Sequence, residues 1–97
     1  MPGYAKLFKA SGEIIDVKPA NGRDFSLKEM QDFVGGHIEI VPAAHEDRIL
    51  VCHDEGRLLG FPVNEKATRL YVPIGDMASI PYPIVGDVLV CDRTFVD

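Results

Sequence analysis

The chain has few of the residues that most often mark a specialised class of protein. It contains no tryptophan, two cysteines and three histidines among 97 residues. Two cysteines are too few for a miniprotein built on disulfides, and no apolar run approaches the roughly eighteen residues of a membrane span. The N-terminal stretch MPGYAKLFKASGE also lacks the long apolar segment of a secretory signal. We therefore expect no membrane segment and a cytoplasmic location.

Positive charge is scarce as well. Ten lysines and arginines stand against fifteen aspartates and glutamates, which gives a net charge of −5. The basic residues are spread along the chain, whereas binding to a phosphate backbone needs a concentrated basic face, so nucleic acid is not the expected partner. The contents of 46% hydrophobic and 26% charged residues are typical of a globular protein. The length predicts a single domain over 1–97.

The clearest local signal is a capping box at Ser26 and Glu29. At this spacing the serine hydroxyl accepts from the N–H of Glu29, and the glutamate carboxylate accepts from the N–H of Ser26. Apolar residues then recur at helical spacing, and Gly35-Gly36 suits the end of a helix. The pattern predicts a helix over 27–34. We expect its apolar stripe (Leu27, Met30, Phe33 and Val34) to pack on the sheet face that carries Ile38 and Ile40.

Short β-rich segments surround this helix. The first two flank Ala10-Ser11-Gly12, which predicts a hairpin, and the runs RILVCH and IVGDVLVC are apolar on both faces, which is typical of central strands. We expect strands over 4–9, 13–18, 37–41, 48–53 and 84–91. Asn64 is placed to cap a short second helix over 65–70, while 71–83 shows no regular pattern. Together these elements predict an α+β fold with a mostly antiparallel sheet of four to six strands.

The cysteines and histidines form no recognisable metal or catalytic motif. The candidates (His37, His45, Cys52, His53 and Cys91) contain no close pair such as C-x-x-C. Cys52 and His53 are adjacent on a predicted strand, so their side chains point to opposite faces. We therefore expect no metal ion, no cofactor and no catalytic residue. Cys52 and Cys91 lie inside apolar runs, which is typical of buried, reduced thiols.

The candidate binding site is the segment from His53 to Asn64. Its glycines and proline fix the backbone while polar side chains remain available, an arrangement typical of loops that contact ligands. The alternative is purely structural: residues 54–57 form a turn in which Gly56 adopts a left-handed conformation, and Asn64 only caps a helix. The candidate binding residues are His53, Asp54, Glu55, Arg57 and Asn64, with Glu39 as a neighbour.

Several stretches together resemble the domain-of-unknown-function family 3846. They are VGGHIEIV (34–41), HDEGR (53–57), GFPVN (60–64) and GDV (86–88). The resemblance implies a small protein encoded on a phage, plasmid or conjugative element, in a bacterial cytoplasm, and it names no reaction. The family pattern has asparagine where this chain has His53, and a second proline where it has Val63. If that turn binds a polar group, specificity differs here.

These observations favour a non-enzymatic binding or accessory protein of a mobile genetic element, which sequesters or inhibits a host factor or holds a small ligand. The alternative is a small ligand-handling protein or enzyme whose site forms across a homodimer. A structural or assembly role also stays open. A homo-oligomer fits each of these hypotheses, because a short chain has little room for a deep pocket and a sheet edge invites pairing.

Overall fold

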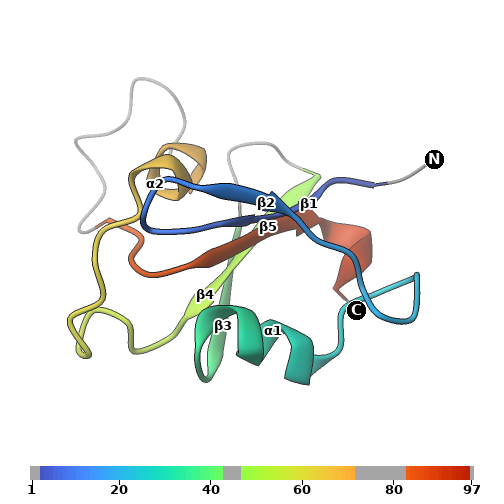
Figure 1. The fold of residues 1–97 in the computed structure, drawn as a ribbon, viewed down its shortest axis with the longest axis horizontal. Coiled ribbons are helices and arrows are strands. Elements are labelled where there is room, and N and C mark those ends of the chain that lie inside the picture. Colours follow the sequence, from blue (N-terminus) through green and yellow to red (C-terminus); the bar gives the residue numbers. More distant parts are fainter. Residues whose placement is uncertain (1–2, 43–46, 72–82, 97) are drawn as a thin grey trace.

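Five strands form one antiparallel sheet in the computed structural model, which describes residues 3–42, 47–71 and 83–96. In chain order they are β1 (Ala5–Phe8), β2 (Ile14–Asp16), β3 (Ile38–Pro42), β4 (Arg48–His53) and β5 (Val88–Asp92). Their order across the sheet is β2-β1-β5-β4-β3, so the last strand of the chain pairs with the first (Figure 1). The sheet edges are therefore β2 and β3.

Helices cover the two faces of this sheet. Helix α1 (Leu27–Val34) lies below the sheet and α2 (Glu65–Tyr71) lies above it in Figure 1. A short 3-10 helix, η2 (Arg93–Phe95), follows β5. The predicted α+β fold, with a firm helix over 27–34 and a short second helix, is confirmed. No helix within 3–42, 47–71 and 83–96 is long and apolar enough to cross a membrane.

The capping box at the start of α1 forms as predicted. Ser26 Oγ accepts a hydrogen bond from the N–H of Glu29 at 3.1 Å, and Glu29 Oε1 accepts from the N–H of Ser26 at 2.8 Å. The other carboxylate oxygen of Glu29 accepts from the N–H of Ala20 at 2.9 Å. These backbone donors, that of Ser26 first, hold the pKa of the Glu29 carboxyl below its ordinary value. The helix ends at Val34 and is capped by Gly35, whose φ of 88° is left-handed and favours glycine.

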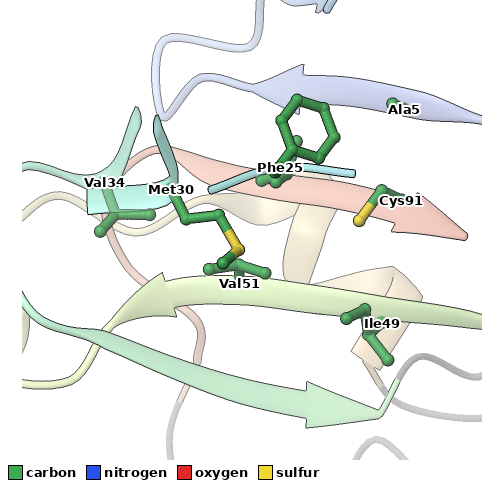
Figure 2. Packing of buried hydrophobic residues seen from close by; sticks show 8 residues of the cluster. Ala5, Phe25, Met30, Val34, Ile49, Val51 and Cys91 are labelled. Atoms are coloured by element: carbon green, nitrogen blue, oxygen red, sulfur yellow. The ribbon is translucent and has the colours of Figure 1, made fainter. Parts of the chain in front are cut away.

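A hydrophobic core fills the space between α1 and the sheet (Figure 2). Met30 reaches from α1 toward Val51 on β4, and Phe25 precedes the helix cap. The ring of Phe25 packs edge-on against Phe33 at a centroid distance of 5.7 Å. The buried residues of this cluster are Ala5, Phe25, Met30, Val34, Ile49, Val51, Leu89 and Cys91. They join α1 to three adjacent strands, so this core fixes the helix on the sheet.

Two residues of the expected helix–sheet contact lie outside this core. Phe33 and Ile38 pack against it as predicted, but Leu27 is 56% exposed and Ile40 is 47% exposed. Leu27 is the first residue of α1 and lies on the solvent side of the helix. Ile40 lies on the edge strand β3, where a side chain has a neighbouring strand on one side only. Both expectations of burial were wrong.

The opposite face of the sheet carries a second hydrophobic cluster. Ala67 of α2 packs there, with Leu70 partly buried beside it. The strand residues of this cluster are Phe8, Leu50, Cys52, Val88 and Val90. Both β4 and β5 therefore bury side chains on both faces, as their continuous apolar runs predict.

Candidate functional site

The carboxyl end of β4 is shaped by His53, which is buried. Its Nδ1 accepts a hydrogen bond from the backbone N–H of Glu55 at 2.9 Å. Its ring packs edge-on against Phe61 at a centroid distance of 5.1 Å. Its Nε2 lies against Gly36 so closely that no side chain would fit at that glycine. His53 therefore fixes the turn after β4 against the segment that follows α1.

Glycine is required at position 56 because there is no room for a Cβ atom, and not because the backbone is left-handed. Its φ is not positive, so the predicted left-handed conformation was wrong. A Cβ on Gly56 would lie 2.9 Å from Val85 Cγ2 and 3.2 Å from Phe61 Cδ2. The left-handed glycines of this region are Gly60 and Gly86, with φ of 77° and 76°. Together these glycines let the segment after β4 pack closely on the segment before β5.

Hydrogen bonds tie the same two segments together. The N–H of Gly86 donates to the carbonyl of Pro62 at 2.8 Å, and Val63 forms an isolated antiparallel bridge with Val85. The bridge therefore joins the loop after β4 to the segment that leads into β5. The strand predicted over 84–91 is regular only from Val88 onward.

A groove of about 260 Å³ opens where these segments meet the sheet. Its polar lining combines Glu39 on β3 with His53, Asp54 and Arg57 at the end of β4. Its remaining walls include Val41, Cys52, Ile84 and Val85. The structure thus brings Glu39 next to the predicted segment, as its place as a neighbour predicts.

Two of the candidate binding residues do not line this groove. Glu55 is exposed, whereas Asn64 is only 1% exposed. The Nδ2 of Asn64 donates to the carbonyls of Phe8 at 2.7 Å and Gly86 at 2.8 Å. Its Oδ1 accepts from the N–H of Ala67 at 3.1 Å, which is the predicted cap of α2. Asn64 therefore caps α2, as the structural alternative predicts, and in addition joins β1 to the segment before β5.

Two carboxylates set the charge of the groove beside Cys52. Burial is the main cause that raises the pKa of the Cys52 thiol to about 11, and the charges of Glu39 and Asp54 raise it further. Both carboxylates therefore act on the same thiol from the groove lining. The sulfur also lies 3.6 Å from the carbonyl of Glu39, to which the thiol donates. Arg57 adds a positive charge to this lining.

We predict that both cysteines react slowly with a thiol reagent in the folded protein at neutral pH. They are free and buried, and burial raises the pKa of Cys52 to about 11 and that of Cys91 to about 12. Ellman's reagent should therefore label the two thiols only after denaturant has unfolded the protein. Above the ordinary pKa of 9.0, the unfolded thiols lose their protons before the folded ones, so the free energy of unfolding should fall as pH rises. Rapid labelling of either thiol in native protein at neutral pH would contradict this prediction.

No three His, Cys, Asp or Glu side chains that could hold a metal ion lie together in the described part of the chain. His45, one of the candidate ligands, falls outside it. So do residues 72–82 of the expected irregular segment, although Pro83 at its end lines the groove.

The apolar wall of the groove could not be predicted from the sequence. Ile84 and Val85 belong to the run predicted as a strand, and Cys52 to the predicted core. The bridge between Val63 and Val85 fixes the position of this wall. It joins residues that are far apart in the sequence, so no local pattern predicts it. A local signal near this wall is Gly86, a glycine inside an otherwise strand-like run.

The chain belongs to the family described as a domain of unknown function, DUF3846, whose model matches residues 11–95. The expected family is therefore confirmed. The matched range contains α1, α2, every strand except β1, and all the residues that line the groove. No curated protein and no solved structure gives a significant match.

Proposed function

We propose that this protein is a non-enzymatic binding protein of a mobile genetic element, and that the groove at the end of β4 holds a host protein. The observation that carries the proposal is the convergence of Glu39 with Asp54 and Arg57 in one lining. These charged side chains come from an edge strand and from the turn after its neighbour. A few convergent polar groups in a concave site with apolar walls are typical of binding sites.

The rigidity of the turn supports binding. The rings of His53 and Phe61 pack on each other, and Gly56 leaves no free space against Val85. A loop that is already fixed in its bound conformation loses little conformational entropy when a partner docks. The charged side chains at this turn are thus presented on a preorganised backbone.

Two exposed leucines favour a protein over a small molecule as the partner. Leu58 and Leu59 follow Arg57 directly and are 85% and 59% exposed. A protein surface can cover these side chains and reach the charged lining of the groove at the same time. Apolar residues beside a few charged groups are typical of such interfaces.

The chemistry of the groove supports binding over nucleophilic catalysis. The one thiol in its lining, Cys52, has a raised pKa and therefore stays protonated near neutral pH. The His53 imidazole uses Nδ1 to accept from Glu55, and its opposite side is covered by Gly36. Both groups are engaged in holding the backbone. The parts of the proposal that concern a mobile genetic element and a bacterial cytoplasm are supported by the family resemblance alone.

One observation favours the second candidate, a ligand-handling site formed across a homodimer. Glu39 and Val41 line the groove and lie on β3, which is an edge of the sheet. A second copy placed along that edge would add its own residues to the groove. A metabolite that co-purifies in stoichiometric amount would support this candidate over the first.

Capture from extracts of the bacterial host tests the proposal. The groove variant is Asp54→Asn with Arg57→Gln, and the matched control is Glu65→Gln with Arg69→Gln, an exposed pair on α2. Each double variant removes one charge of each sign, so the net charge is unchanged. We expect quantitative mass spectrometry to find a host protein retained by the wild type and the control and depleted on the groove variant. Equal retention on all three proteins would contradict the proposal.

A further inference from the structure

The outer edge of β3 is unpaired among the described residues. Its register with β4 runs without a break from Ile38 opposite His53 to Pro42 opposite Ile49. Natural edge strands usually avoid pairing through charged side chains, lysine above all, through prolines or through bulges. The pairing of β3 with β4 has no bulge, the strand carries Glu39 as its one charged residue, and its one proline, Pro42, is its last residue. The strand is therefore a regular, five-residue template for another strand.

One hydrogen bond determines which backbone groups point outward. The N–H of Asp54 donates to the carbonyl of His37 at 3.1 Å, so His37 directs its carbonyl toward the chain that continues β4. In an antiparallel ladder the direction alternates from residue to residue. The backbone N–H and carbonyl groups of Glu39 and Val41 therefore also point toward β4. Those of Ile38, Ile40 and Pro42 point to the free edge, although Pro42 has only a carbonyl there.

We infer that two copies of this chain pair along β3, antiparallel, about a twofold axis at Ile40. In this register the N–H of each Ile40 donates to the carbonyl of the partner's Ile40. The N–H of Ile38 donates to the carbonyl of the partner's Pro42. Proline has no N–H, so the carbonyl of Ile38 accepts no bond from the partner's Pro42 and stays open to water. The pairing thus forms four backbone hydrogen bonds across the axis. The edge is thus complementary to itself, as an isologous interface requires.

The side chains fit the same axis. Ile40, which is 47% exposed, meets the partner's Ile40 on the same face of the sheet. Glu39 lies opposite the partner's Val41, so no like charges stand directly across the seam. This match of the strand with itself favours a second copy over an unrelated chain as the occupant of the edge.

The pairing has a consequence for the groove. A twofold axis perpendicular to the sheet keeps equivalent faces of both copies on the same side. Because Glu39 and Val41 line the groove, the partner's Val41 lies next to Glu39, and the two grooves open side by side across the seam. The inference does not depend on what the groove binds.

Analytical ultracentrifugation across micromolar concentrations tests this inference. The matched variants are Ile40→Lys on β3 and Ile14→Lys on the opposite edge strand β2, since Ile14 is 42% exposed. We expect the wild type and Ile14→Lys to be dimers and Ile40→Lys, which sets like charges opposite each other, to be a monomer with an unchanged circular dichroism spectrum. A monomeric wild type, or a dimer that Ile40→Lys leaves intact, would overturn the inference.

A cross-link keeps the test decisive if Ile40→Lys does not fold. In Ile40→Cys the two new thiols face each other at the axis, within the range of separations that a disulfide spans. Mild oxidation should give a covalent dimer for Ile40→Cys and none for Ile14→Cys, while Cys52 and Cys91 stay buried. If Ile40→Cys gives no covalent dimer, or Ile14→Cys gives as much, the β3 axis is wrong.

Discussion

Replacing Phe25 with alanine should lower the free energy of unfolding by about 3–5 kcal/mol, the usual range for a core phenylalanine. Phe25 is 4% exposed, and its ring contacts those of Phe33 and Phe95 at centroid distances of 5.7 Å each. The substitution would leave a cavity where the chain enters α1. Denaturation in urea, followed by circular dichroism, measures the loss.

The control for this substitution is Leu27→Ala, at the start of α1. Leu27 is 56% exposed, so its truncation should change stability by no more than about 0.5 kcal/mol. A loss below about 1 kcal/mol for Phe25→Ala would mean that α1 does not dock on the sheet through this core.

Asn64→Ala should cost about 2–4 kcal/mol of stability, which is more than the loss of a helix cap alone. The amide group of Asn64 caps α2 and also donates to the carbonyls of Phe8 and Gly86. Its removal leaves these carbonyls without the donors that satisfy them in the interior. Thermal denaturation should show a fall in the melting temperature of the order of 10 °C or more for a domain of this size.

Asn64→Ser separates the cap from the other two hydrogen bonds. Serine keeps an oxygen that can accept from the N–H of Ala67 but cannot replace the two donors. We expect Asn64→Ser to regain only a minor part of the stability lost in Asn64→Ala. Full recovery would show that Asn64 acts as a cap alone and would contradict the connecting role assigned to it.

The sequence predicted the elements whose signals are local. The capping box at Ser26 and Glu29, followed by Gly35, defines both ends of α1 within ten residues. The runs that form β4 and β5 are apolar on both faces because a helix covers each face of the sheet. In these cases a short stretch of sequence contains the physical cause of the structure.

Features that depend on distant contacts could not be predicted. Glycine's freedom of φ suggested a left-handed Gly56, but the close approach of Val85 and Phe61 is what requires glycine there. The exposure of Ile40 follows from the position of β3 at the sheet edge, which alternation along one strand does not reveal. The position of Asn64 just before a helical segment predicts its role as a cap. Its hydrogen bonds to the carbonyls of Phe8 and Gly86 could not be predicted, because they depend on the complete fold.

The affinity of the captured host protein for the groove variant tests the central proposal most directly. Calorimetry would compare Asp54→Asn with Arg57→Gln against the control pair, Glu65→Gln with Arg69→Gln. Because charged hydrogen bonds contribute about 1.5–3 kcal/mol, the groove variant should bind at least about tenfold more weakly than the wild type, with a similar melting temperature. The control should bind as tightly as the wild type. Equal affinities for the groove variant and the control would contradict the assignment of this groove as the binding site.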